Sequence, residues 1–327
     1  MKILVTGGAG YLGSSLVSKI KKCHDVTVFD NLMYNQGTLV SGCIVDSLNF
    51  GEMPRSSVKF YKEDVNDWSE NLVEAIKEAD VIIPLAALVG APLCDRRESE
   101  TTKTNYKWFV KLVELLDDSQ LVIYPNTNSG YGSTGEAVCT EETPLNPISL
   151  YAKTKQLAEE YLLNNHKKTI VFRLATVFGW SPRPRTDLLV NNLTRVFKEE
   201  SHVEVFDGHF RRNYIHVEDI VRAFEFAIFM NKKMVGQAFN LGNDSLNVSK
   251  EGLVKQISDF MSSQGYDVSY SQDSSRTDPD KRDYLVSSKK LYDLGYHCTR
   301  GIEHGVSEML RFYDVMCPSD EEKCKNY

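Results

Sequence analysis

The sequence lacks the features that mark several classes of protein. Its seven cysteines are odd in number and scattered, with no C-x-x-C pair, which favours reduced thiols in a cytoplasmic protein over a disulfide framework or a zinc site. Basic residues are not in excess, and the net charge of −7 argues against a general binder of nucleic acid or of an anionic membrane. The longest uncharged apolar stretch, Val81–Cys94, is too short to span a membrane.

No internal repeat or low-complexity segment is visible either, and no spacing of His, Cys and Asp indicates a metal site. The first residues run directly into a predicted strand, so we expect no signal peptide before the fold. What is present is a chain of 327 residues with 42% hydrophobic and 25% charged residues. This is the composition of a globular protein with a large core.

The chain begins with a strand, a glycine-rich turn and a helix. The apolar run Ile3–Val5 predicts a buried strand, and the turn after it fits both G-x-G-x-x-G and G-x-x-G-x-x-G. Apolar side chains then recur every four residues on one face of a predicted helix, at Leu12, Leu16 and Ile20. Glycines let the backbone approach a pyrophosphate closely, and the helix N-terminus offers that anion free N–H groups. The unit therefore predicts a dinucleotide site.

Asp30 ends the next predicted strand, Val26–Phe29, and completes this unit. It follows Gly10 at about the 20-residue spacing expected of the acid that binds the adenosine ribose hydroxyls. A carboxylate there would repel a 2′-phosphate, so the sequence favours NAD over NADP. The alternative is an ordinary glycine-rich turn, but the register of strand, helix, second strand and acid favours nucleotide binding.

Strands and helices alternate through the first half of the chain, which predicts an α/β fold with a doubly wound parallel Rossmann sheet. Further strands are expected at Val58–Tyr61, Val81–Leu85, Leu121–Tyr124 and Ile170–Leu174, with a short one at Ala238–Leu241. Helices are expected at Trp68–Lys77, Thr104–Leu116, Leu150–Asn164, Asp187–Lys198, Val217–Met230, Lys250–Ser262 and Ile302–Val315. Residues 1–175 are predicted to form the NAD-binding domain, with 213–241 partly returning to it. Residues 176–327 are predicted to form a smaller substrate-binding lobe that ends in a polar, disordered tail, Cys317–Tyr327.

Tyr151 and Lys155 lie four residues apart and share one face of a predicted helix. A free phenol has a pKa near 10, too high for a base at neutral pH. We expect the neighbouring ammonium and the positive nicotinamide ring of NAD⁺ to lower that pKa, and Lys155 could also hold the nicotinamide ribose. Tyr-x-x-x-Lys alone is common on surface helices. Its occurrence behind a dinucleotide unit, with Thr127 at the end of the fifth predicted strand, favours a catalytic role.

Taken together, these motifs resemble the extended short-chain dehydrogenase/reductase family, specifically its nucleotide-sugar epimerases and dehydratases. The resemblance covers nearly the whole chain and keeps the family order. The matching segments are Thr6–Gly13 (TGGAGYLG), Asp30-Asn31-Leu32, Asp64-Val65, Leu85-Ala86-Ala87, Tyr131-Gly132, Tyr151–Lys155 (YAKTK) and Arg212–Val217 (RNYIHV).

The resemblance implies NAD as the cofactor, Tyr151 as the base with Lys155 beside it, and Thr127 as their hydroxyl partner. Cofactor contacts are implied at Gly7, Gly10, Tyr11, Leu12, Asp30, Asn31, Asp64, Val65, Leu85, Ala86, Ala87, Tyr151 and Lys155. Contacts with a nucleoside-diphosphate sugar are implied at Asn128, Ser129, Arg183, Asn191, Arg212, Arg276 and Arg282. Arginines suit the diphosphate because a guanidinium binds phosphate oxygens in a fork. The family also implies a homodimer formed through the helices Thr104–Leu116 and Leu150–Asn164, and no nucleic-acid or membrane partner is expected.

Some positions depart from the family pattern. Pro84, Gly130 and Leu150 replace a histidine, a bulky apolar residue and a proline that the family often carries there. The family's 4,6-dehydratases carry Asp-Glu where this chain has Asn128-Ser129, so the acid and base for eliminating water are missing. The favoured function is therefore oxidation at C4 of the sugar, by a 4-epimerase or a 4-dehydrogenase. The alternatives are a 4,6-dehydratase and a non-catalytic NAD-sensing protein on the same fold.

A narrower resemblance points to the branch that acts on GDP-heptoses in bacterial capsular polysaccharide pathways, including GDP-D-glycero-α-D-manno-heptose 4-dehydrogenases. It is carried by Pro84–Pro92 (PLAALVGAP), Tyr124–Gly132 (YPNTNSGYG) and Asp278–Ser287 (DPDKRDYLVS). Two polar features outside these segments receive simpler interpretations. His216 is predicted to be a packed histidine between a strand and a helix, and Glu141-Glu142 a solvated turn.

Overall fold

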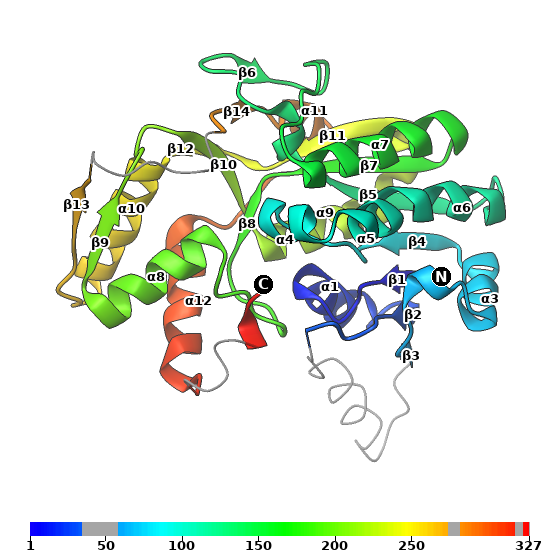
Figure 1. Cartoon of the computed structure of the whole chain (residues 1–327), viewed down its shortest axis with the longest axis horizontal. Coiled ribbons are helices and arrows are strands. Elements are labelled where there is room, and N and C mark those ends of the chain that lie inside the picture. Colours follow the sequence, from blue (N-terminus) through cyan, green and yellow to red (C-terminus); the bar gives the residue numbers. More distant parts are fainter. Residues whose placement is uncertain (35–57, 274–281, 318–322, 327) are drawn as a thin grey trace.

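The computed structural model describes residues 1–34, 58–273, 282–317 and 323–326. At its centre is a seven-stranded sheet in which each strand runs parallel to its neighbours, in the order β11-β7-β5-β4-β1-β2-β3 (Figure 1). The strands are β1 (Lys2–Thr6), β2 (Asp25–Phe29), β3 (Val58–Tyr61), β4 (Val81–Pro84), β5 (Leu121–Thr127), β7 (Thr169–Leu174) and β11 (Gln237–Leu241). This confirms the predicted doubly wound sheet. Its order reverses between β1 and β4, and the crevice outside the strand ends at such a point is where ligands bind.

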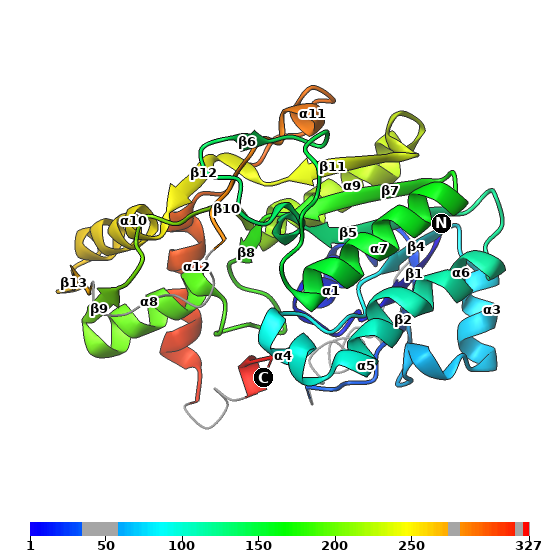
Figure 2. The same cartoon turned by 45° about the horizontal axis from the view of Figure 1, so that its top comes forward.

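Helices cover both faces of this sheet, so its strands are buried on both sides as parallel sheets require. On one face, α1 (Tyr11–Ile20) and α9 (Val217–Met234) pack through Leu16, Ile20, Ile220 and Phe224. On the other face, α3 (Glu70–Glu78), α6 (Trp108–Leu115) and α7 (Leu150–Asn165) pack through Leu72, Trp108, Leu112 and Leu162. Figure 2 shows α6 and α7 lying along the same side of the sheet.

The second lobe is built on a smaller sheet of β8 (Thr176–Phe178), β10 (Arg211–His216) and β12 (Asn243–Ser249). It has its own core, in which Phe178, Phe197 and Ile257 are fully buried. Its helices are α8 (Leu189–Glu200), α10 (Lys250–Ser263) and α12 (Ile302–Val315), on the left in Figure 1. Other short elements are β6 (Val138–Cys139), β9 (His202–Val205), β13 (Ser269–Gln272), β14 (Leu285–Val286) and α11 (Lys289–Tyr292). No helix in the described ranges has the length and apolar character to cross a membrane.

The main difference from the predicted elements lies between β4 and β5. The expected helix Thr104–Leu116 is the end of a longer helical region made of α4 (Ala91–Arg96), α5 (Glu98–Thr102), a π-helical turn (Lys103–Lys107) and α6. The sequence hides α4 because Gly90 and Pro92 resemble a turn. Gly90 indeed has a φ of +95°, but Pro92 sits in the first helical turn, where a missing N–H costs nothing.

The end of the chain also differs from prediction. The disordered tail expected from Cys317 is wrong for Lys323–Asn326, because the side chains of Cys324 and Asn326 are each only 8% exposed. The backbone N–H of Thr186 donates to the carbonyl of Cys324 (3.0 Å), which joins this segment to the loop before α8. A polar composition predicted solvent exposure, and tertiary contacts with a distant loop decide otherwise.

Gly13, the third residue of α1, provides a test of the packing in the glycine turn. A Cβ at this position would lie 2.3 Å from the Gly7 carbonyl oxygen and 2.6 Å from Gly8 Cα. Gly13→Ala is therefore expected to destabilise the fold by about 2 kcal/mol or more, since these contacts are backbone atoms that do not move aside. Gly252→Ala is the matched control. Gly252 is the third residue of α10, and its Cβ would lie 3.2 Å from the Ser249 hydroxyl and at an ordinary contact distance of 3.9 Å from Val248 Cβ.

Urea denaturation of both variants measures the two free energies of unfolding. We expect Gly252→Ala to stay within about 1 kcal/mol of the wild type, because the gain in helix propensity offsets a mild contact. Equal stabilities of the two variants would contradict the close packing described here.

Candidate active site

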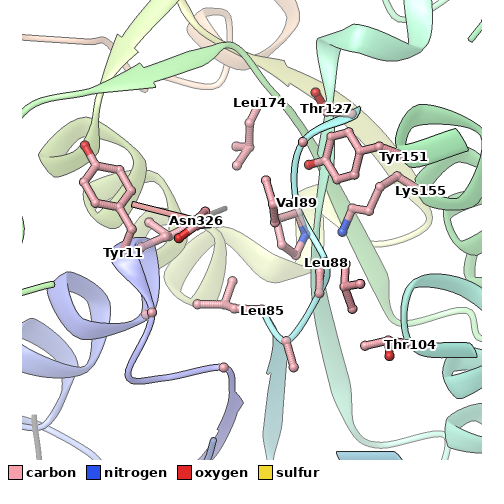
Figure 3. A pocket seen from close by; sticks show the side chains of 18 of the residues that line it. Tyr11, Leu85, Leu88, Val89, Thr104, Thr127, Tyr151, Lys155, Leu174 and Asn326 are labelled. Atoms are coloured by element: carbon pink, nitrogen blue, oxygen red, sulfur yellow. The ribbon is translucent and has the colours of Figure 1, made fainter. Parts of the chain in front are cut away.

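One cavity of about 420 Å³ lies at the carboxyl ends of the central strands (Figure 3). Its lining combines the glycine turn after β1, the loops after β2, β4 and β5, the start of α7 and the segment after β7. Every residue that the sequence predicted as a cofactor contact lines this cavity. The switch point of the sheet thus brings together side chains from distant parts of the chain.

The glycine turn has a shape that only glycines permit. Gly7 has a φ of +70°, and a Cβ on it would lie 2.6 Å from the backbone nitrogen of Ala86 in the loop after β4. Gly10 forms the N-cap of α1 without any capping side chain. The start of α1 therefore faces the cavity with uncapped N–H groups and the positive end of the helix dipole, as a dinucleotide pyrophosphate requires.

Asp30 lies beside this turn and is only 8% exposed. Its carboxylate accepts hydrogen bonds from the backbone N–H groups of Ala9 (2.9 Å) and Leu32 (2.8 Å), which fix its orientation. Burial raises its pKa, and the two hydrogen bonds oppose this rise. Asp64 is linked to the same loop, because the side-chain amide of Asn31 donates to it at 2.9 Å. These residues would hold the adenosine half of NAD, so the cavity fits the cofactor.

Thr127, Tyr151 and Lys155 converge at the other end of the cavity (Figure 3). Thr127 is the last residue of β5, and its hydroxyl donates to Ser129 Oγ at 3.1 Å. Tyr151 and Lys155 lie in the first two turns of α7, whose N-terminus is capped by Ser149. The Lys155 ammonium nitrogen lies 4.1 Å from the centre of the Tyr124 ring. The structure therefore brings the three predicted catalytic side chains to one place.

Burial governs the ionisation of this group. It raises the pKa of the Tyr151 phenol to about 12; the charge of Cys94 adds to the rise, and the charges of Arg185 and Arg282 oppose it. It lowers the pKa of Lys155 to about 7, against the opposing charges of Cys94 and Glu159. The expected lowering of the Tyr151 pKa by Lys155 is thus not seen. The desolvation of both groups outweighs their proximity, and the positive charges that act on the phenol come from two arginines.

Arg185 was not predicted as a site residue, but it lines the cavity. Its guanidinium binds the Asp187 carboxylate through two nitrogens, one of them Nε at 3.0 Å, and the Asp187 side chain is only 3% exposed. Little in the sequence indicates this role, because Arg183-Pro184-Arg185 looks like an ordinary basic loop. Only the tertiary structure shows that Arg185 lies at the cavity. Arg282 and Ser129, which were predicted, also line the cavity, and Arg282 donates to Ser129 Oγ.

Two other predicted substrate contacts, Asn191 and Arg212, are not part of the cavity lining. Asn191 is fully buried and uses its amide to hold backbone groups, accepting from Gly179 N–H (2.9 Å) and donating to the Arg185 carbonyl (2.9 Å). Arg212 lies over the ring of Tyr284, with 5.4 Å between the guanidinium carbon and the ring centre. Asn191 therefore has a structural role in this fold, and Arg212 packs against Tyr284, which lines the cavity.

Three further substrate predictions remain. Arg183 lies outside the lining and binds the C-terminal segment, donating to Asn326 Oδ1 at 2.6 Å. Asn128 is fully buried, lies outside the lining, and has no partner for either amide atom within the described residues. Arg276 lies outside the residues that the structure describes. Direct contact of Arg183 and Asn128 with substrate would require them to leave these positions.

A buried ionic network lies beneath the catalytic group. Arg173 on β7 pairs with Glu159 on α7 at 2.6 Å, and their side chains are 9% and 4% exposed. Glu159 also accepts from the amide of Asn126, which precedes Thr127 on β5. Arg173 donates to the Tyr131 hydroxyl (3.0 Å), which in turn donates to Asn240 (2.6 Å). The network therefore joins β5, α7 and β7, and two of these elements, β5 and α7, carry the predicted catalytic residues.

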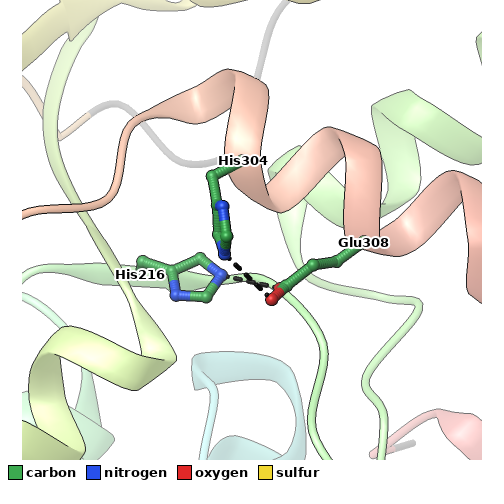
Figure 4. A group of neighbouring side chains, drawn as sticks. All are labelled: His216, His304 and Glu308. Carbon is green, nitrogen blue, oxygen red and sulfur yellow. Dashed lines mark hydrogen bonds and ion pairs between the residues drawn. The ribbon is translucent and has the colours of Figure 1, made fainter.

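A second cluster of titratable side chains lies outside the cavity (Figure 4). His216 on β10 meets His304 and Glu308 on α12, with their ligand-capable atoms all within 4.8 Å. The backbone N–H of Glu218 donates to His216 Nδ1 (3.2 Å), which places the proton of a neutral ring on Nε2. Nε2 then donates to Glu308 (2.8 Å) and has no lone pair left for a metal ion. The prediction of a packed histidine is confirmed, since His216 is 1% exposed.

The comparisons with known proteins agree with this geometry. A family model described as "NAD dependent epimerase/dehydratase family" matches residues 3–242. A dTDP-D-glucose 4,6-dehydratase of Dictyostelium discoideum is 28% identical over 279 residues, which cover 78% of this chain but only 61% of that protein. The structure of a dTDP-glucose 4,6-dehydratase from Bacillus anthracis in complex with NAD has a TM-score of 0.77 and 26% identity, and the match covers 96% of each chain. A UDP-glucose 4-epimerase from Thermotoga maritima with UDP-glucose has a TM-score of 0.75 and 25% identity, over 96% and 99%.

The Glu159–Arg173 pair yields a stability prediction. Glu159→Gln removes one partner of a buried ion pair and leaves Arg173 as an uncompensated charge. We expect a loss of about 3–5 kcal/mol in the free energy of unfolding, measured by urea denaturation. Glu160→Gln, the exposed neighbour on the same helix, is the control and should change stability by less than about 0.5 kcal/mol. A similar small loss in both variants would contradict the role of the network.

Lys155 yields a pH prediction for protein freed of NAD. The pKa of Lys155 is about 7 in the fold, against 10.5 for an ordinary lysine. Between these two pH values the unfolded chain binds more protons than the folded one, so stability rises with pH across this window. Below it, the folded state bears the whole cost of a buried charge. Lys155→Met should therefore raise the free energy of unfolding at pH 6 by on the order of 2–5 kcal/mol, since one pKa unit corresponds to about 1.4 kcal/mol.

Thermal unfolding of Lys155→Met and wild type between pH 6 and pH 10 tests this expectation. The advantage of the variant should shrink steadily as pH rises through the window. Lys153→Met, at an exposed position of the same helix, should show no such trend. A constant difference between Lys155→Met and wild type at all pH values would argue against a depressed lysine pKa.

Proposed function

Because this chain belongs to the NAD dependent epimerase/dehydratase family, we propose that it oxidises C4 of a nucleoside-diphosphate sugar, as a 4-epimerase or a 4-dehydrogenase. Its homologues are NAD-dependent enzymes, and NAD is the cofactor. The observation that carries the proposal is the meeting of Thr127, Tyr151 and Lys155 in the same cavity as the glycine turn and Asp30. Tyr151, the proposed proton acceptor, thus lies in the same cavity as the residues proposed to bind the dinucleotide.

In the proposed reaction, Thr127 and Tyr151 bind the 4-hydroxyl of the sugar from two sides. Tyr151, ionised to the phenolate, takes the hydroxyl proton while C4 loses hydride, and a 4-keto sugar results. Bound NAD⁺ supplies the hydride acceptor and a positive ring that favours the phenolate. Arg185 and Arg282 already act in the same direction on Tyr151, and burial gives these charges a stronger effect than they would have in water.

The fate of the keto sugar separates the two forms of this proposal. An epimerase returns hydride to the other face of C4, whereas a dehydrogenase releases the keto product and needs its NADH reoxidised. Elimination of water is less favoured, because the residues after Thr127 are Asn128 and Ser129. Asn128 is buried outside the cavity lining, and the Ser129 hydroxyl is held by Thr127 and Arg282. Neither residue supplies a carboxylate as acid or base.

We further propose a GDP-heptose-type sugar and a place in capsular polysaccharide biosynthesis, on the resemblance of the segments around Pro84–Pro92 and Tyr124–Gly132. Free cysteines throughout the described residues support a reducing, cytoplasmic location. A homodimer through the helical region Thr104–Leu116 and α7 is supported by exposed apolar side chains at Ile148 and Leu157, which are 61% and 43% exposed. A monomeric sedimentation result would overturn the dimer.

The decisive experiment follows purified protein by proton NMR with UDP-, GDP-, CDP- and dTDP-sugars, GDP-heptose included, without added NAD. Catalytic accumulation of a C4 epimer would establish the epimerase. A 4-keto product limited to one turnover, and rescued by an external keto acid, would establish the dehydrogenase. No change with any sugar would instead favour an NAD-sensing protein and overturn the proposal.

Tyr151→Phe tests the base. The variant keeps the ring in place and removes only the hydroxyl, so turnover is expected to fall by about 10³-fold or more while NAD remains bound. Tyr161→Phe is the matched control, since Tyr161 lies on the same helix outside the cavity lining. An active Tyr151→Phe protein would remove this mechanism, whereas loss of NAD from it would show a structural defect instead.

A further inference from the structure

The C-terminal segment Lys323–Asn326 is part of the cavity wall. Asn326 lines the cavity, although every other lining residue comes from the first 284 positions of the chain. Its side chain lies on the Tyr11 side of the cavity in Figure 3, across from Tyr151 and Lys155. Figures 1 and 2 show this segment, in red, between the helices of the second lobe and the elements around the central sheet.

Arg183 holds this segment in place. Its Nη1 donates to Asn326 Oδ1 at 2.6 Å, and its Nη2 donates to the carbonyl of Lys325 at 2.9 Å. The same guanidinium lies over the ring of Tyr34, 4.7 Å from its centre, and Tyr34 lines the cavity after β2. Thr186 N–H adds a third hydrogen bond, to the Cys324 carbonyl. Arg183 thus joins the loop after β2, the loop before α8 and the C-terminal segment.

These contacts leave one pair of donors unused. Asn326 is 8% exposed, and its oxygen is bound to Arg183. Its amide nitrogen makes no hydrogen bond within the described residues and is not one of their buried atoms that lack a partner, so it is accessible from the cavity that Asn326 lines. An amide N–H pair that is accessible from a cavity can donate to a bound ligand without breaking a hydrogen bond within the protein. Phosphate and ribose oxygens are acceptors of the matching kind.

The residues around Asn326 indicate which ligand its amide nitrogen would bind. Tyr11 follows the glycine turn, and Tyr34 follows the strand that ends in Asp30, so both belong to the dinucleotide half of the cavity. We propose that Asn326 donates a hydrogen bond to bound NAD, and that Lys323–Asn326, held by Arg183, forms part of the NAD site. The inference rests on NAD as the cofactor and not on the identity of the sugar.

The test measures the dissociation constant of NADH by fluorescence titration, using full-length protein freed of cofactor. Asn326→Ala should raise this constant about 5-fold, the factor that corresponds to one hydrogen bond of about 1 kcal/mol. Arg183→Met should raise it at least as much, although Arg183 does not line the cavity, because the segment loses its anchor. Together the two substitutions should weaken NADH binding less than the product of their separate effects, since they act through one contact.

Two controls keep the result specific. Asn165→Ala, at the exposed end of α7, should bind NADH like the wild type. The dissociation constants of UDP and GDP, measured on the same proteins, should not change. Unaltered NADH affinity in both Asn326→Ala and Arg183→Met would overturn the proposal, as would a loss confined to UDP or GDP. Failure of wild-type protein to bind NADH would overturn the cofactor assignment as well, which distinguishes the two failures.

Discussion

The buried ion pair between Arg173 and Glu159 connects the elements on which the site depends. Arg173 lies on β7 and Glu159 on α7, and the hydrogen bonds of the pair reach Asn126 on β5 and the Tyr131 hydroxyl. Burying two charges costs more than their attraction returns unless further hydrogen bonds satisfy both groups. Here those hydrogen bonds run to the strand and the helix that carry the catalytic side chains. The hydrogen bonds that offset the burial of the two charges therefore also fix the relative positions of these elements.

The same exclusion of water sets the chemistry of the cavity. A buried phenol and a buried amine each favour the neutral form, so Tyr151 holds its proton more tightly and Lys155 less tightly than in water. Charges that face such a site act over a low dielectric. Arg185, supported by the buried Asp187, and Arg282 supply positive charge close to Tyr151. Two arginines of the second half of the chain therefore lower the pKa of a tyrosine on α7, against the effect of its burial.

Much of the fold followed from local patterns. The glycine turn, the alternation of apolar strands with amphipathic helices and the acid at Asp30 predicted the parallel sheet, and the boundaries of β3 and α12 agree with prediction. The errors lie where a local signal has two meanings. No helix was predicted at Gly90 and Pro92, where α4 begins, and the polar tail that was predicted to be disordered packs at Lys323–Asn326. The short strands of the second lobe carry too little periodicity to be recognised before they pair.

The sequence by itself determined the cofactor unit and the candidates for the reaction, because both depend on spacing: glycines in one turn, an acid at the end of the next strand, and a tyrosine and lysine on one helical face. The tertiary structure alone decided which polar groups meet. It places Arg185 at the cavity and Asn326 on the side of the glycine turn. Asn191 instead binds backbone groups, and Arg183 binds the C-terminal segment. The spacing of residues can be read from the chain, whereas the burial of a side chain and the charges around it depend on residues that are distant in the sequence.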